Sequence, residues 1–74
     1  MCGIAGWIGN IDFRRTNFML NALEPRGPDS SGEWVSTNRQ VWLGHRRLKI
    51  LDLSENSNQP MTSKCNRYVL CYNG

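Results

Sequence analysis

The stretch CGIAGWI, residues 2–8, follows Met1 directly and is a short apolar run rich in small residues. A run of this length favours a buried strand over a helix, and Gly9-Asn10 then predicts a turn. If Met1 is removed, Cys2 carries both a thiol and a free α-amine, and the pKa of such an amine is about 7.7–8.0. An amine with this pKa is suited to take a proton from the thiol and return it later. The position alone therefore leaves two interpretations open, a small buried residue that happens to be second and a nucleophilic Cys2.

The next segment predicts one helix. Thr16 fits the N-cap position, and the helix must end by Glu24 because Pro25 disfavours helical backbone in the residue before it. The apolar residues at helical spacing within this segment are Phe18, Met19, Ala22 and Leu23. A loop of turn-forming residues is expected to follow at 26–32.

The remainder of the chain predicts strands. Residues 34–36 and 41–43 are expected as a hairpin, residues 47–53 alternate in polarity, and residues 68–72 are expected as a last apolar strand. One helix among several strands predicts an α+β fold with antiparallel pairing. At 74 residues the chain holds at most one small domain. Asn73-Gly74 is a turn dipeptide that normally leads into further chain, so we expect the chain to be incomplete.

Composition argues against several classes of protein. The cysteines, Cys2, Cys65 and Cys71, are too few for a disulfide framework and are expected as reduced thiols. His45 has no ligand partners at zinc spacing, so no metal site is expected. The net charge is +3, and the basic cluster at 45–49 has no interleaved aromatic residues, so nucleic acid is not an expected partner. There is neither a long apolar run nor a signal peptide, so no membrane is expected, and reduced thiols fit a cytoplasmic location.

Four ordered motifs resemble the glutaminase domain of glutamine-hydrolysing asparagine synthetases, which are class II glutamine amidotransferases. The motifs are MCGIAG at 1–6, RGPDSSG at 26–32, GHRRLKILDL at 44–53 with QPM at 59–61, and YNG at 72–74. The resemblance implies the N-terminal nucleophile hydrolase fold, a four-layer αββα sandwich. Residues 1–74 would form only its first part, an incomplete glutamine amidotransferase type-2 domain without a synthetase domain. One departure is Pro25, where the family usually has His, and we expect it to alter the end of the helix rather than the chemistry.

The same resemblance implies roles for single residues. Cys2 would attack the side-chain amide of glutamine, release ammonia and form a glutamyl thioester that water hydrolyses. The Asn73 side chain and the Gly74 backbone N–H would stabilise the oxyanion, with a plain turn as the alternative. Arg47 would bind the α-carboxylate of glutamine through two parallel hydrogen bonds, with a surface charge as the alternative. The implied catalytic residues are Cys2, Asn73 and Gly74, and the implied glutamine-binding residues are Arg47, Leu48, Lys49, Ile50, Leu51, Asn73 and Gly74.

Other polar residues in these motifs are expected to be structural. Arg46 should point to the opposite face of the strand from Arg47 and is expected to be a solvated charge. Arg26 and Asp29 are expected to hold their loop by a local ion pair rather than to act in catalysis. The tryptophans, expected in the core rather than at a substrate, are Trp7, Trp34 and Trp42.

The function implied by the resemblance is hydrolysis of glutamine to glutamate and ammonia, followed by ATP-dependent amidation of aspartate to asparagine. No cofactor is expected within residues 1–74, because ATP and magnesium would belong to the missing synthetase domain. That domain and glutamine are the implied partners, in a full-length protein that is homodimeric. Two alternatives stay open: a related amidotransferase acting on another carboxylate, and an inactive fragment without catalytic function.

Overall fold

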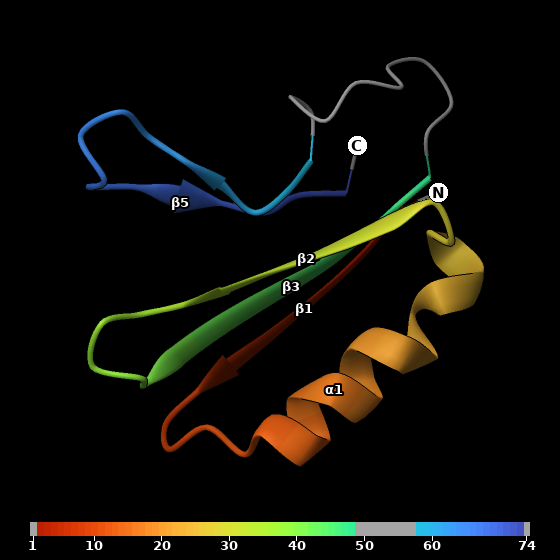
Figure 1. The fold of residues 1–74 in the computed structure, drawn as a ribbon, viewed down its shortest axis with the longest axis horizontal. Helices are drawn as coiled ribbons and strands as arrows, with labels where there is room; N and C mark the ends of the chain where they lie inside the picture. Colours follow the sequence, from red (N-terminus) through yellow and green to blue (C-terminus); the bar gives the residue numbers. More distant parts are fainter. Residues whose placement is uncertain (1, 49–57, 74) are drawn as a thin grey trace.

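The computed structural model describes residues 2–48 and 58–73. Figure 1 shows a sheet of three long strands in the middle, one α-helix below it and a short two-stranded hairpin above it. The elements in chain order are β1 (Gly3–Ile8), α1 (Phe13–Ala22), the 3₁₀ turn η1 (Glu24–Arg26), β2 (Ser30–Val35), β3 (Val41–Arg47), β4 (Met61–Thr62) and β5 (Val69–Leu70). The expected α+β composition is confirmed.

The main sheet has three strands in the order β1-β3-β2, and both pairings are antiparallel. In the register of β1 with β3, Gly3 pairs with Arg46 and Ile8 with Val41. In the register of β2 with β3, Ser30 pairs with Arg47. The start of β1, the start of β2 and the end of β3 therefore lie together at one end of the sheet.

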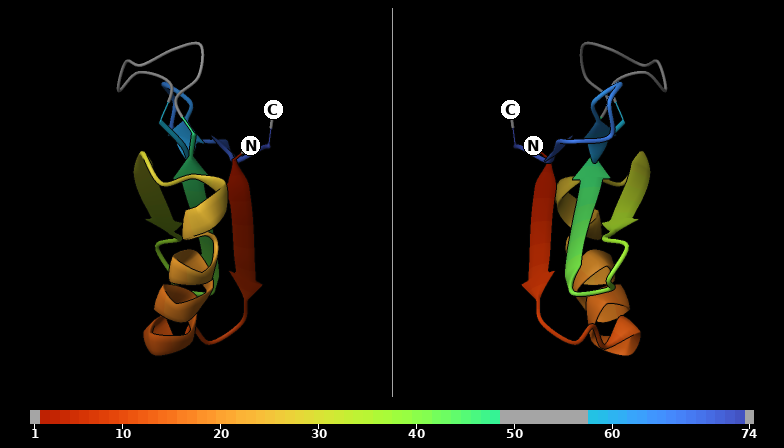
Figure 2. Two further views of the ribbon diagram at one scale, coloured as in Figure 1. Left: turned by 90° about the vertical axis from the view of Figure 1, so that its right-hand side faces the viewer. Right: turned by 90° about the vertical axis from the view of Figure 1, so that its left-hand side faces the viewer.

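The two faces of this sheet carry different elements. Helix α1 covers one face, and the two-stranded β4–β5 hairpin lies on the other side (Figures 1 and 2). Because side chains alternate along a strand, Arg46 faces the helix while His45 and Arg47 face the hairpin side. The segment that leads into β4 comes close enough to β2 that a Cβ on Gly32 would collide with the backbone carbonyl oxygen of Gln59.

The core lies between α1 and the sheet. Trp42 in β3 is fully buried there, beside Leu20 of the helix, which is also buried. The indole Nε1 of Trp42 donates a hydrogen bond of 3.1 Å to Oε1 of Glu33, so its polar group keeps a partner. The expected burial of Trp42 is confirmed, whereas Trp7 and Trp34 are only half-buried.

The predicted start of the helix was wrong. The N-cap is Asp12 rather than Thr16, and its Oδ1 accepts hydrogen bonds from the backbone N–H groups of Arg14 and Arg15 at 3.0 and 3.4 Å. Thr16 is instead buried within α1. The predicted end by Glu24 agrees with the structure, since α1 stops at Ala22 before the short 3₁₀ turn that contains Pro25.

The predicted hairpin at 34–36 and 41–43 is confirmed, but both strands are longer. The first begins at Ser30, inside the expected loop, and the second continues to Arg47 because it pairs with a neighbour on each side. The predicted strand at 47–53 is described only as far as Leu48, and its remainder lies outside the described residues. The last expected strand is limited to Val69–Leu70, where it pairs with β4.

Candidate active site

Cys2 lies immediately before β1 and is buried, with 9% of its surface exposed. Because Gly3 pairs with Arg46, Cys2 lies next to the end of β3, where Arg47 is the last strand residue. The carbonyl oxygen of Cys2 accepts a hydrogen bond of 3.1 Å from Nε of Arg26. The backbone of the candidate nucleophile is therefore held by the sheet and by Arg26.

This contact corrects the role expected for Arg26. Among the described residues the ion pair present is between Arg15 and Asp12, so the expected local pair of Arg26 with Asp29 is not formed. Arg26 instead reaches Cys2, 24 residues earlier in the chain. The contact that Arg26 makes fixes the segment that carries the thiol, and its structural role stays a prediction.

The loop after Arg26 packs directly on the end of β3. A Cβ on Gly27 would collide with the backbone of Arg46 and Arg47, so only glycine permits this approach. Next to it, the backbone N–H of Asp29 donates a hydrogen bond of 3.1 Å to the carbonyl of Arg47. The RGPDSSG and GHRRL motifs are therefore in contact, although about 20 residues separate them in the sequence.

Arg47 is buried, with 5% of its surface exposed, which contradicts the alternative of a plain surface charge. Its Nη1 donates a hydrogen bond of 2.8 Å to Oδ1 of Asn58, and the same oxygen accepts a bond of 3.2 Å from Oγ of Ser30. A buried guanidinium with an oriented planar fork is suited to bind a carboxylate. Asn58 was not predicted, because it belongs to a polar segment with no strand or helix periodicity.

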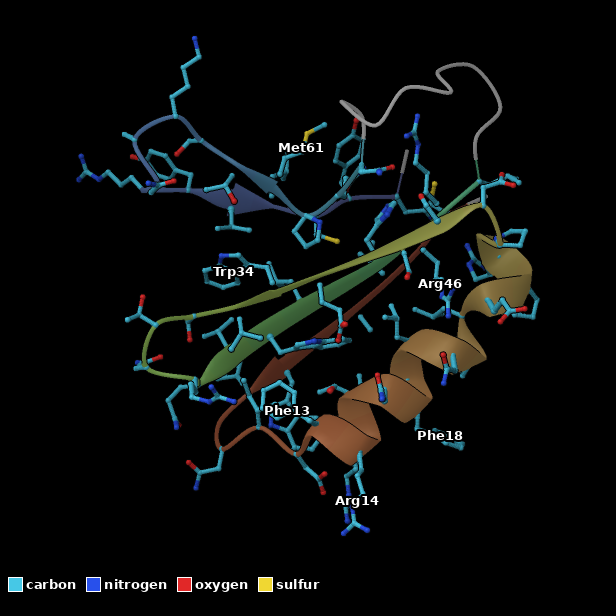
Figure 3. The ribbon with its side chains drawn as sticks, viewed as in Figure 1. Phe13, Arg14, Phe18, Trp34, Arg46 and Met61 are labelled. Carbon is cyan, nitrogen blue, oxygen red and sulfur yellow. The ribbon has the colours of Figure 1, made fainter. Side chains whose placement is uncertain are left out.

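Arg46 points to the opposite face, as predicted, but it is not a solvated charge. Its Nε donates to the carbonyl of Leu20 at 3.0 Å and its Nη2 to Oδ1 of Asn21 at 3.1 Å. Figure 3 shows the side chain between the sheet and α1. The carbonyl of Leu20 lies in the last turn of the helix and also accepts a hydrogen bond of 3.2 Å from the backbone N–H of Leu23, the C-cap residue. Arg46 therefore ties the end of α1 to β3.

The segment after β5 runs toward the end of the sheet where the N-terminus lies (Figure 1). The backbone N–H of Tyr72 donates a hydrogen bond of 2.6 Å to Oε1 of Gln59, which is buried. One residue earlier, the thiol of Cys71 contacts the carbonyl of Gly44 at 3.5 Å. Asn73 follows this segment and is exposed. The catalytic prediction for Asn73 stays a prediction.

Part of the predicted glutamine pocket is not described. Leu48 is half-buried directly after β3, while Lys49, Ile50, Leu51 and Gly74 lie outside the described residues. Their predicted roles stay predictions. No group of three or more His, Cys, Asp or Glu that could hold a metal occurs among the described residues. Their cysteines are all free thiols, and none of their helices is long and apolar enough to cross a membrane.

His45 is a buried polar residue on the hairpin side of the sheet, and the sequence did not reveal its burial. It is 1% exposed, and its Nε2 has no hydrogen-bond partner among the described residues. Burial lowers the pKa of the imidazole and the positive charge of Arg47 lowers it further, while a hydrogen bond with the Tyr72 backbone acts in the opposite direction. His45 is therefore neutral in the folded chain at neutral pH.

We expect this neutral His45 to make the fold sensitive to acid. The unfolded chain binds a proton near its ordinary pKa of about 6.5, whereas folded His45 binds it only at lower pH. The contribution of neutral His45 to stability is therefore fully present above that pH. As the pH is lowered further, the free energy of unfolding decreases by at most about 1.4 kcal/mol per pH unit for this one proton. Thermal melts of the full-length protein between pH 7 and 5 measure this. His45→Gln should lose this part of the pH dependence, and an unchanged dependence would contradict the assignment.

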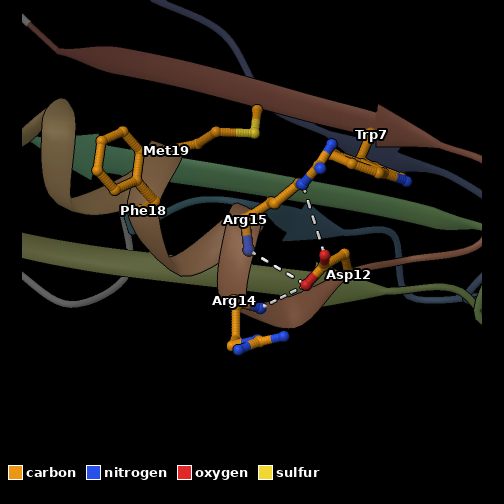
Figure 4. Close-up of a pocket in the computed structure, with 6 residues that line it drawn as sticks. All are labelled: Trp7, Asp12, Arg14, Arg15, Phe18 and Met19. Carbon is orange, nitrogen blue, oxygen red and sulfur yellow. Dashed lines mark hydrogen bonds and ion pairs between the residues drawn. The ribbon is translucent and has the colours of Figure 1, made fainter.

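A groove elsewhere on the molecule contains none of the predicted site residues. It has a volume of about 580 Å³ and runs beside the first half of α1 (Figure 4). Its lining residues are Trp7, Asp12, Arg14, Arg15, Phe18 and Met19. The candidate site is defined instead by the buried groups at the opposite end of β1.

The candidate site thus joins a buried cysteine at residue 2 with a buried arginine at the end of the neighbouring strand. Comparison with known domain families identifies the family. A family described as glutamine amidotransferase domain matches residues 1–74, and the chain belongs to it. The class predicted from the sequence motifs is confirmed.

Three curated relatives are similar to the chain. A putative glutamine-hydrolysing asparagine synthetase 2 of Methanocaldococcus jannaschii is 44% identical over 66 residues, covering 82% of the chain and 13% of the relative. The amidase chry2 of Gibberella zeae is 38% identical over 74 residues, covering 81% and 11%. The glutamine-hydrolysing asparagine synthetase 1 of Saccharomyces cerevisiae is 35% identical over 78 residues, covering 100% and 13%. The chain thus spans about an eighth of the length of these relatives, and no solved structure matches it.

Proposed function

We propose that this chain is the nucleophile-bearing part of a glutaminase domain that hydrolyses glutamine to glutamate and ammonia. The observation that carries the proposal is the position of Cys2 beside the end of β3, where the buried Arg47 lies. Both residues stand at one end of one sheet and belong to motifs far apart in sequence. Cleavage of an amide can use a thiol as nucleophile, and an oriented guanidinium can hold a free carboxylate of the same substrate. Cys2 and Arg47 offer these two groups at neighbouring positions.

In this proposal the thiol of Cys2 attacks the side-chain amide carbonyl of glutamine. The α-amine exposed by removal of Met1 takes the thiol proton and passes it to the departing ammonia, which leaves a glutamyl thioester. Water then hydrolyses the thioester and regenerates the thiol. The Asn73 side chain and the Gly74 backbone N–H stabilise the oxyanion in each step, and one such donor contributes roughly 2.7–4 kcal/mol to lowering the barrier.

Arg47 binds the α-carboxylate of glutamine in this proposal, and the backbone of residues 48–51 lines the pocket beside it. The residues 1–74 would form the first part of the four-layer αββα fold of N-terminal nucleophile hydrolases. The family membership and the mixed helix and strand content support this assignment. A cytoplasmic location stays a prediction.

The ammonia acceptor proposed is aspartate, amidated by an ATP-dependent synthetase domain that also holds magnesium, in a homodimeric protein. Similarity to two proteins named as asparagine synthetases supports this acceptor. A second candidate is transfer to another carboxylate, because the chain is also similar to a relative that is named an amidase and not an asparagine synthetase. The test is to supply the full-length protein with glutamine, ATP and either aspartate or other carboxylic acids, and to identify the amide product by mass spectrometry. Formation of an amide other than asparagine would replace the first candidate with the second.

Arg47→Lys in the full-length protein is expected to raise KM for glutamine by about 10- to 100-fold, because lysine cannot form the paired hydrogen bonds of a guanidinium. Arg46→Lys is the matched control. Its partners are on α1, so it should lower the melting temperature and leave KM for glutamine nearly unchanged. Steady-state ammonia release measures both values. Equal increases in KM for the two variants would contradict the role of Arg47.

A further inference from the structure

Two consecutive polar residues, Asn58 and Gln59, contact both halves of the candidate site. Asn58 accepts a hydrogen bond of 2.8 Å from the Arg47 guanidinium. Gln59 accepts one of 2.6 Å from the backbone of Tyr72, the residue before Asn73. One short segment therefore holds the predicted carboxylate-binding group and the chain that leads to the predicted oxyanion donors. We propose that Asn58 and Gln59 are positioning residues of the glutaminase reaction, an inference that rests on the proposed function.

The geometry around Gln59 supports a fixed position for it. The residue is buried, with 8% of its surface exposed. The backbone carbonyl oxygen of Gln59 lies so close to β2 that a Cβ on Gly32 would collide with it. A side-chain acceptor on a segment that is itself packed against a strand can hold a backbone N–H at a fixed place. Since Tyr72 is one residue from Asn73, displacement of its peptide group displaces the oxyanion donors with it.

The partners of Asn58 indicate a different effect on the reaction. Its Oδ1 lies between the guanidinium of Arg47 and the hydroxyl of Ser30, which is fixed in β2. This oxygen orients the planar group that binds the carboxylate of glutamine. That carboxylate does not change during the reaction, so its binding contributes equally to the ground state and the transition state. Asn58 therefore acts on KM, whereas Gln59 acts on kcat.

The experiment uses the full-length protein and measures kcat and KM for glutamine by ammonia release. Gln59→Met, which removes the acceptor at similar volume, should lower kcat by about 100-fold with KM nearly unchanged, because a small displacement of catalytic groups has effects of this size. Gln59→Glu keeps the acceptor oxygen and should recover most of kcat. Asn58→Leu should raise KM by about 10-fold, as expected for loss of a hydrogen bond to a charged group, with kcat nearly unchanged. Thr62→Val, on the exposed part of β4, is the control and should change neither constant.

A second measurement separates positioning from general damage to the fold. Iodoacetamide labelling of Cys2, followed on its peptide by mass spectrometry, should proceed at the parent rate in all four variants. If Gln59→Met does not fold, Gln59→Asn takes its place. The asparagine side chain is one methylene shorter, so its oxygen should not reach the backbone N–H of Tyr72, and the same loss of kcat is expected. Equal changes in kcat and KM, a Gln59→Glu variant as slow as Gln59→Met, or unchanged constants would each overturn the inference.

Two control proteins separate failure of the proposed glutaminase function from failure of the positioning roles. Parent protein and Cys2→Ala are assayed beside the positioning variants. If the parent releases no ammonia from glutamine, or if Cys2→Ala still does, the proposed function is wrong and the inference falls with it. If ammonia release depends on Cys2 but the separation of kcat from KM is absent, only the roles of Asn58 and Gln59 are wrong.

Discussion

Cys2→Ala in the full-length protein is expected to abolish glutamine-dependent amidation and to leave ammonia-dependent amidation close to the parent level. Alanine preserves the small buried side chain but has no nucleophile, so no thioester can form. Amidation with free ammonia needs no thiol. Product formation from glutamine and from ammonium chloride, measured side by side, tests this. An Ala variant that hydrolyses glutamine at the parent rate would show that Cys2 is not the nucleophile.

Retention of Met1 provides a control that keeps the thiol. With Met1 in place the α-nitrogen of Cys2 is an amide, which cannot accept the thiol proton. A protein in which excision is blocked should therefore lose glutamine-dependent activity almost as completely as Cys2→Ala, although its thiol is intact. Mass spectrometry of the N-terminus reports the fraction processed, and the residual activity should follow that fraction.

Local features of the sequence were sufficient to predict the elements that bear the site. Within the short apolar run at residues 2–8, Gly3–Ile8 form β1, and the turn around residues 37–40 connects β2 to β3. The expected burial of this strand was wrong, because Ile4 and Ile8 are exposed. The start of the helix was missed because Phe13-Arg14-Arg15 follows the capping Asp12 without apolar periodicity. The periodic pattern begins only near Thr16, which led to an N-cap placed four residues too late.

Contacts between distant segments could not be predicted in the same way. Strand alternation correctly placed Arg46 and Arg47 on opposite faces, but it does not reveal which element covers each face. Helix α1 covers the face of Arg46, so this arginine is bonded to the helix end rather than solvated. Asn58 and Gln59 make their contacts across 11 and 13 residues, and these depend on the path of the chain. Asn58 and Gln59 lie in a polar segment without helix or strand periodicity, so the sequence pattern does not predict their hydrogen-bond partners.

The apolar surface of the described residues suggests how the chain behaves alone. Ile8 is 88% exposed, Phe18 is 74% exposed and points away from the sheet, and Leu70 is 53% exposed (Figure 3). The accessible surface is 5322 Å², whereas a compact monomer of the same mass has about 4,650 Å². In the three-stranded sheet, β1 and β2 each have one unpaired edge among the described residues. Exposed apolar faces and open edges favour association with further protein or aggregation.

Expressed as a 74-residue polypeptide, the chain is therefore expected to release no ammonia from glutamine and to show no sharp thermal transition. Ordering the chain costs roughly 1.5 kcal/mol per residue, and burial of apolar surface returns only about 25 cal/mol per Å². Among the described residues only Cys2, Leu20 and Trp42 are buried apolar side chains, so we expect burial to contribute too little free energy for a cooperative transition. Circular dichroism melts and an ammonia-release assay on the polypeptide test this, with the Cys2→Ala polypeptide as the control. A sharp, reversible transition accompanied by ammonia release that disappears in the control would show that these residues already form a working glutaminase.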